Sequence, residues 1–313
     1  MQRTDLKLAS PVALALCLAG CGGGGSDSAG LKSTPIPVPA PTPTPTPTPT
    51  PGTRAVKVFP DINVSTDFAT LGIEANRVGN SPRTLTTNGF SVRFDASSGV
   101  YVMDFPSAVP AGFYEFGGNT PNATWWGGEL LEPNGNAPAS VAVLKPSNPQ
   151  LQLSYTSLAI YDTSGMSPEP YGAVAFGTAT PTSAMPVTGS ASYSAFVAGS
   201  TFDNQYYIRG SASLSFDFGA GTLSGHLDPL IYDMSGGALS LGRYSFTNTV
   251  FGVGSNGFSG QLTNPAVSGT GAFTGLFTGP AAQELMARWQ APFVIPYSQT
   301  TSQMFGVFVG KKD

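Results

Sequence analysis

Histidine occurs once in the 313 residues, at position 226. A hydrolase with a Ser-His-Asp arrangement would have to use His226 as its base, because the imidazole takes the proton of the serine. The chain has no Gly-x-Ser-x-Gly segment, the turn that exposes the nucleophile in one large class of these enzymes. We therefore interpret His226 as a polar residue at the end of a strand and expect no enzymatic activity.

Two other segments have the spacing of ligand loops. Residues 252–257 read Gly-Val-Gly-Ser-Asn-Gly, the glycine spacing of a dinucleotide-binding turn. That turn requires a following helix, whereas the residues from Phe258 onward look like a strand, so we predict a hairpin turn. Residues 61–67 have the polar spacing of a calcium loop, but Thr66 and Gly72 stand where such a loop needs glycine and glutamate. We expect no bound metal.

Trp125 and Trp126 are stronger candidates for a binding site. Adjacent residues of a strand face opposite ways, so both rings can be core only if the strand is buried on both faces. We expect one ring to pack inside the protein and the other to be exposed. Exposed tryptophan is enriched in binding hot spots. The alternative is that both rings serve packing alone.

Strands must position these residues, because polar and apolar residues alternate along much of the chain. Residues 211–218 read Ser-Ala-Ser-Leu-Ser-Phe-Asp-Phe, which places Ala212, Leu214, Phe216 and Phe218 on one face. Eight further segments look like strands: 151–161, 171–176, 187–198, 222–227, 241–247, 257–262, 269–278 and 303–309.

These segments predict an all-β protein. Eight strands close a small barrel whose interior is filled by side chains, so one of the nine segments is expected to be a loop or a hinge strand. Residues 281–289 look helical, with Pro280 placed for a first helical position. Upstream, residues 90–105 predict a hairpin that turns at residues 96–99.

The N-terminus has the layout of a secretory signal peptide. Arg3 and Lys7 precede an apolar run that ends in small residues, and the run is too short to span a bilayer. The segment Leu18-Ala-Gly-Cys resembles the box of bacterial lipoproteins. The resemblance implies removal of residues 1–20 and attachment of acyl chains, palmitate among them, to Cys21. Gly22 follows where inner-membrane lipoproteins usually carry aspartate, so we expect an outer-membrane anchor.

A linker, residues 21–59, follows the anchor. Four glycines come first, and residues 35–51 are almost entirely threonine and proline, which favours an extended polyproline II stalk. Cys17 would be removed and Cys21 acylated, so no intrachain disulfide can form. The net charge of −4 makes the chain a poor partner for nucleic acid.

The strands also resemble, in order, those of transferrin-binding protein B-like lipoproteins. The resemblance rests on a signature at residues 271–285 (Gly-Ala-Phe-Thr-Gly-Leu-Phe-Thr-Gly-Pro-Ala-Ala-Gln-Glu-Leu), on residues 175–181, 185–193 and 215–225, and on a closing Phe-Gly-Val-Phe-Val-Gly. It implies a β-rich handle domain, residues 60–150, and an eight-stranded antiparallel barrel, residues 151–313. The chain departs from the signature at Thr278, where the family usually has tyrosine, and at residues 286–289. The chain has one handle and one barrel, and in this it resembles the single-lobe members of the family.

The resemblance further implies display on the cell surface by a translocator and binding of a ligand that differs between members. Some of them bind haem, so His226, or the phenols of Tyr206 and Tyr207, could ligate iron. The alternative is that the two tyrosines only flank a strand or a hairpin tip. We expect a non-enzymatic lipoprotein that binds a protein or an iron- or haem-bearing carrier and passes it to an outer-membrane receptor. The alternative function is a host- or matrix-binding coat protein with no role in uptake.

Overall fold

The computed structural model describes residues 58–59, 61–76, 84–107, 112–114, 130–131, 140–145, 151–163, 170–232, 237–296 and 298–313. All of them belong to one compact unit, Thr50–Asp313. The expected signal peptide, Cys21, the threonine–proline stalk and the pair Trp125 and Trp126 lie outside the described residues. No helix in the described ranges is long and apolar enough to cross a membrane.

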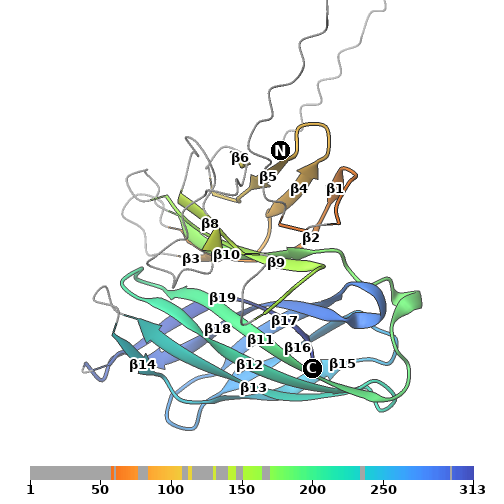
Figure 1. The fold of residues 1–313 in the computed structure, drawn as a ribbon. Coiled ribbons are helices and arrows are strands. Elements are labelled where there is room, and N and C mark those ends of the chain that lie inside the picture. Colours follow the sequence, from red (N-terminus) through yellow and green to blue (C-terminus); the bar gives the residue numbers. More distant parts are fainter. Residues whose placement is uncertain are drawn as a thin grey trace, which may run out of the picture. The chain divides into compact units, whose positions relative to one another are not determined.

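Eight antiparallel strands close into a barrel (Figure 1). They are β11 (Ser190–Thr201), β12 (Tyr207–Asp217), β13 (Thr222–Tyr232), β15 (Tyr244–Phe251), β16 (Gly257–Thr263), β17 (Gly271–Thr278), β18 (Glu284–Val294) and β19 (Thr301–Lys312). Each pairs with the next, and β19 pairs back with β11 to complete the ring. A short strand, β14 (Ala238–Ser240), adds to β13. The predicted fold class and the predicted hairpin turn at residues 252–257 are confirmed.

Side chains fill the barrel. On β12 the predicted face is correct, because Leu214 and Phe216 are fully buried whereas Ser213 and Ser215 are exposed. The rings of Phe216 and Phe277 meet edge to face at 4.7 Å. Around them lie further buried aromatic side chains, which include Tyr193, Phe218, Tyr244, Phe258, Trp289 and Phe293. The barrel is therefore a packed hydrophobic core.

The predicted helix at residues 281–289 is wrong. Residues 280–282 form a single 3-10 turn, η3 (Pro280–Ala282), and the chain continues as β18. Leu285 and Trp289 point into the barrel, whereas Met286 belongs to an apolar cluster outside it. Residues 281–288 are rich in strong helix formers such as Ala, Gln, Glu, Leu and Met, which is why the segment suggested a helix. A second 3-10 turn, η2 (Thr182–Ala184), precedes β11.

Two smaller sheets lie upstream of the barrel in sequence. The six-stranded sheet has the order β3 (Thr84–Thr86), β2 (Ala69–Asn76), β10 (Tyr171–Gly177), β9 (Thr156–Asp162), β8 (Ser140–Leu144) and β7 (Leu130–Leu131). The four-stranded sheet has the order β1 (Thr66–Asp67), β4 (Ser91–Asp95), β5 (Val100–Asp104) and β6 (Gly112–Tyr114). Pairing of β4 with β5 confirms the predicted hairpin.

The assignment of residues 151–161 and 171–176 to the barrel is wrong. These segments form β9 and β10, which pair with each other and with β8 and β2 of the six-stranded sheet. The first strand of the barrel is β11, which begins at Ser190. Local sequence can indicate a strand, but it cannot show which of two neighbouring sheets the strand joins.

Both faces of the six-stranded sheet are covered. One face carries Leu158, Ile160 and Ala175, which pack against Phe196 and Val307 on the outer wall of the barrel. The other face packs against the four-stranded sheet in a second cluster, which includes Val143, Tyr161, Val174, Phe176, Phe94, Tyr101 and Met103. Part of the barrel wall is thus apolar on the outside because the six-stranded sheet covers it.

Candidate functional site

Tyr206 and Tyr207 stand where β12 begins, after the short loop that follows β11. The two tyrosines therefore flank a strand, which is the position that the alternative to iron ligation gave them. Tyr206 packs at the edge of the barrel core, and Tyr207 packs against the cluster between the barrel wall and the six-stranded sheet. The two rings point in opposite directions because successive strand residues alternate. Only Tyr207 therefore faces the six-stranded sheet.

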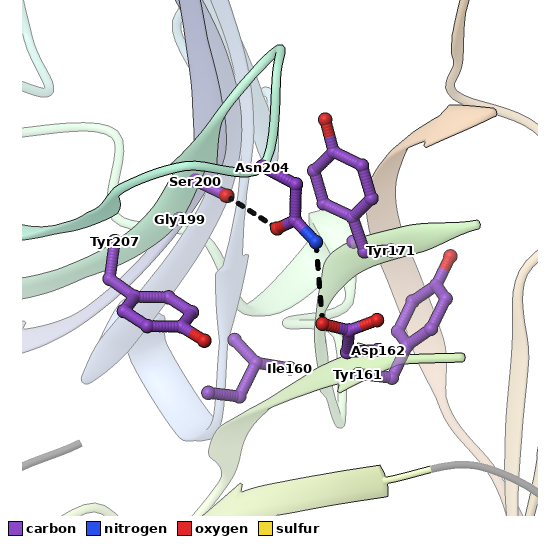
Figure 2. Close-up of a pocket in the computed structure, with 9 residues that line it drawn as sticks. Ile160, Tyr161, Asp162, Tyr171, Gly199, Ser200, Asn204 and Tyr207 are labelled. Atoms are coloured by element: carbon purple, nitrogen blue, oxygen red, sulfur yellow. Dashed lines mark hydrogen bonds between the residues drawn. The ribbon is translucent and has the colours of Figure 1, made fainter. Parts of the chain in front are cut away.

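Tyr207 lines a pocket between the barrel and the six-stranded sheet (Figure 2). Its other lining residues are Ile160, Tyr161, Asp162, Tyr171, Gly172, Gly199, Ser200 and Asn204. Figure 2 shows Asn204 between Ser200 and Asp162, with its Nδ2 donating to the carboxylate of Asp162 at 3.3 Å. The hydroxyl of Ser200 donates to Oδ1 of Asn204 at 3.3 Å. One amide therefore connects the end of β11 to the end of β9.

The loop that bears Asn204 is held from a second side. The hydroxyl of Tyr171 donates to the carbonyl of Phe202 at 2.6 Å. Asn204 itself adopts a left-handed backbone conformation, with φ of 59°, which asparagine tolerates better than most residues. These contacts position the start of β12 against the six-stranded sheet.

The pocket offers hydrogen bonds and apolar contact. Burial, and next the charge of Asp162, raise the pKa of Tyr207, so its phenol stays protonated at neutral pH. Phenols, an amide and one carboxylate line the pocket, whose volume of about 20 Å³ has room for one water molecule. A predicted site residue, Tyr207, thus lies in a real pocket, and the residues around it were not evident from the sequence.

His226 lies elsewhere on the barrel. It stands in the middle of β13, so the expected strand-end position is wrong. Its Nε2 is 3.4 Å from Oδ2 of Asp228, and Arg243 donates two hydrogen bonds to that same carboxylate at 2.8 and 2.9 Å. The hydrogen bonds from Arg243 hold the pKa of Asp228 below its usual value.

The structure does not bring His226 and the two tyrosines together. His226 pairs with Ser213, six residues along β12 from Tyr207, which corresponds to about 20 Å. The described part of the chain contains no group of three or more His, Cys, Asp or Glu side chains that could hold a metal ion. A shared iron site of His226 and these tyrosines is therefore not formed.

Glu284, a residue that the sequence analysis missed, connects the barrel to the segment before β9. The residue is 4% exposed, and its carboxylate accepts hydrogen bonds from the backbone N–H groups of Ser154 at 2.6 Å and Tyr155 at 2.9 Å. Nearby, the hydroxyls of Thr278 and Thr156 share a hydrogen bond. The motif at residues 271–285 contains both Thr278 and Glu284, so it was the sequence feature that could have indicated this contact.

A second buried carboxylate lies within the smaller sheets. Glu74 of β2 is fully buried and accepts hydrogen bonds from the hydroxyls of Ser107 and Tyr161. Gly172 stands between Glu74 and Tyr161 in the sheet, and a Cβ there would collide with both side chains. Burial raises the pKa of Glu74 above its usual value. The sequence contained no signal for this cluster.

Comparison with known proteins shows a match to one protein family. Residues 185–312 match the family described as the C-lobe and N-lobe β-barrels of transferrin-binding protein B. No curated protein sequence matches the chain.

Three solved structures illustrate the likeness at low identity. Transferrin-binding protein B from Haemophilus parasuis is 17% identical with a TM-score of 0.43, over 77% of this chain and 45% of that one. The isotype 1 protein from serogroup B Neisseria meningitidis is 16% identical with a TM-score of 0.42, over 78% and 44%. Kievitone hydratase from Nectria haematococca is 11% identical with a TM-score of 0.24, over 83% and 94%.

The chain spans less than half the length of the two transferrin-binding proteins. The match to the family model covers every strand of the closed barrel, from β11 through β19. Residues 185–312, less than half of the chain, are thus similar to the β-barrels of transferrin-binding protein B.

Proposed function

We propose that this chain is a lipoprotein of the outer membrane, displayed on the cell surface, that binds a protein or an iron- or haem-bearing carrier and has no enzymatic activity. Cys21 is the proposed acylation site, and residues 21–59 are the proposed stalk. A surface-lipoprotein translocator and an outer-membrane receptor are the proposed partners for export and for transfer of the ligand.

The packed interior of the barrel supports a macromolecular ligand over a small one. An eight-stranded barrel can either enclose one small ligand or fill its interior with side chains. Here buried rings such as Trp289, Phe216 and Phe277 occupy the interior. Binding is therefore assigned to the outer surfaces and loops, which suits a macromolecular partner better than a free small molecule.

The family match makes transferrin the first candidate ligand. The two related structures are named for binding transferrin, but each is more than twice as long as the part of it that this chain covers. For binding residues we propose Trp125, Trp126 and Tyr207, with Tyr206 and His226 as weaker candidates since they lie apart from the pocket. The alternative function is a host- or matrix-binding coat protein without a role in uptake.

Binding to intact cells tests the proposal. Cells that produce the full chain are incubated with labelled iron-loaded transferrin, haemoglobin or haem-loaded albumin, and with labelled fibronectin or collagen as matrix probes. We expect saturable binding of one iron or haem carrier, removed by protease treatment of the cells. Binding of a matrix probe alone would favour the coat-protein alternative. Chemical conversion of any probe would contradict the non-enzymatic assignment.

A further inference from the structure

A hollow of about 170 Å³, lined by polar and apolar residues in equal number, lies where β17 and β18 of the barrel meet the six-stranded sheet. Its lining includes Thr274 and Arg288, which stand opposite each other on β17 and β18, and Gln290. Ile73 of β2 and Thr87, just after β3, contribute from the other side. The hollow is separate from the pocket at Tyr207, and the two share no lining residue.

Arg288 is the one charged side chain that lines this hollow among the described residues. Its Nη1 donates to the backbone carbonyl of Thr87 at 2.8 Å, and none of the ion pairs found between described residues includes it. Two other described arginines differ: Arg243 forms two hydrogen bonds with Asp228, and Arg209 lies over the ring of Tyr232. A guanidinium has five N–H donors, so one carbonyl leaves most of them available.

The surroundings of Arg288 increase the effect of a binding anion. The side chain is half-buried, and burial lowers the pKa of its guanidinium, although arginine remains charged at neutral pH. A partly buried cation attracts an anion more strongly than an exposed cation does, because less water surrounds the pair and screens the attraction. Glu74, the acidic neighbour of Ile73, is engaged by Ser107 and Tyr161 and is not among the lining residues.

We propose that this hollow binds a carboxylate, held by the guanidinium of Arg288 with neutral hydrogen bonds from Thr274 and Gln290. Arginine and a carboxylate match as two parallel hydrogen bonds, and the hollow has room for a group of this size. Two sources carry this chemistry: a free small dicarboxylate, or an aspartate or glutamate side chain of a bound protein. Neither source depends on the ligand proposed above, so the site can be tested even if no iron carrier binds.

Thermal unfolding of the purified full chain in detergent tests the site. Sodium succinate and a hexaglutamate peptide are compared with sodium chloride at matched ionic strength. We expect a saturable rise in Tm with succinate, and an apparent affinity about tenfold or more weaker in Arg288→Gln. Arg243→Gln is the matched control, since Arg243 is exposed and already paired, and it should keep the full response. A response to the peptide as well as succinate indicates a protein side chain as the natural ligand; succinate alone indicates a small anion.

A second variant guards against misfolding of Arg288→Gln. Thr274→Glu places a carboxylate directly opposite Arg288, within the reach of a cross-strand pair. It should raise Tm in chloride and abolish the response to both probes, because the added side chain occupies the guanidinium. The proposal is overturned if wild-type protein shows no response to either probe, or if the response persists in Thr274→Glu and Arg288→Gln.

Discussion

Oε1 of Glu284, at the start of β18, accepts the backbone N–H of Ser154 at 2.6 Å, across 130 residues of sequence. The same carboxylate accepts the N–H of Tyr155, so one buried side chain satisfies two backbone donors of the segment that leads into β9. The contact joins the barrel to the six-stranded sheet. It also gives a physical reason for a glutamate in the motif at residues 271–285.

Glu284→Ala should therefore destabilise the protein by about 2–3 kcal/mol, because two buried N–H groups lose their acceptor. Urea unfolding followed by tryptophan fluorescence measures the change. Glu284→Gln is the control: its amide oxygen can still accept one of the bonds, so we expect a smaller loss. Equal stability of Glu284→Ala and the parent would show that the contact does not contribute.

Phe216→Ala tests the barrel core. The ring of Phe216 is fully buried and contacts those of Tyr193, Phe251, Phe258 and Phe277. Its removal should cost about 3–5 kcal/mol, a large part of the stability of a typical domain. Ser215→Ala, on the exposed face of the same strand, should change stability by about 0.5 kcal/mol or less. A parent-like melting curve for Phe216→Ala would contradict the packed interior.

The buried carboxylate of Glu74 should make stability depend on pH. Burial raises its pKa above 4.5, and hydrogen bonds from Ser107 and Tyr161 oppose this shift only in part. The folded state then binds more protons than the unfolded state above about pH 4.5, so the free energy of unfolding falls as pH rises through the folded pKa. Urea titrations from pH 4 to pH 8 measure this slope.

Glu74→Gln removes the titrating group and should flatten that slope. Some slope should remain in Glu74→Gln, because burial also raises the pKa of Glu284. Glu284 therefore also lowers the free energy of unfolding as pH rises. Asp228→Asn is a useful contrast, since hydrogen bonds from Arg243 lower the pKa of Asp228 and its contribution is lost as pH falls. An unchanged pH slope in Glu74→Gln would mean that Glu74 titrates normally.

If Cys21 is the acylation site proposed above, Cys21→Ser should abolish labelling of the protein by a fatty-acid probe, because the variant has no thiol to accept the acyl group. Surface binding of any ligand should fall with it, since the protein is then no longer anchored. Cys17→Ser, in the segment expected to be removed, should label like the parent. Continued labelling of Cys21→Ser would locate the lipid elsewhere.

Local sequence was sufficient to predict the strands that have one exposed face and to identify their buried face. On β12, serine alternates with Leu214 and Phe216, and the structure has the predicted face inside. The hairpin at residues 90–105 and the turn at residues 252–257 were equally predictable, because each depends on neighbouring residues alone.

Only the tertiary structure decided what depends on distant partners. β18 begins with residues that favour helices, such as Glu284, Leu285 and Met286, yet pairing with β17 and β19 makes it a strand of the barrel. β9 was predicted as a strand of the barrel, yet it pairs with β8 and β10 of the six-stranded sheet. The bond from Ser154 to Glu284 and the hollow at Arg288 likewise join residues far apart in sequence. A periodic pattern specifies which side chains share a face, but long-range packing determines what that face meets.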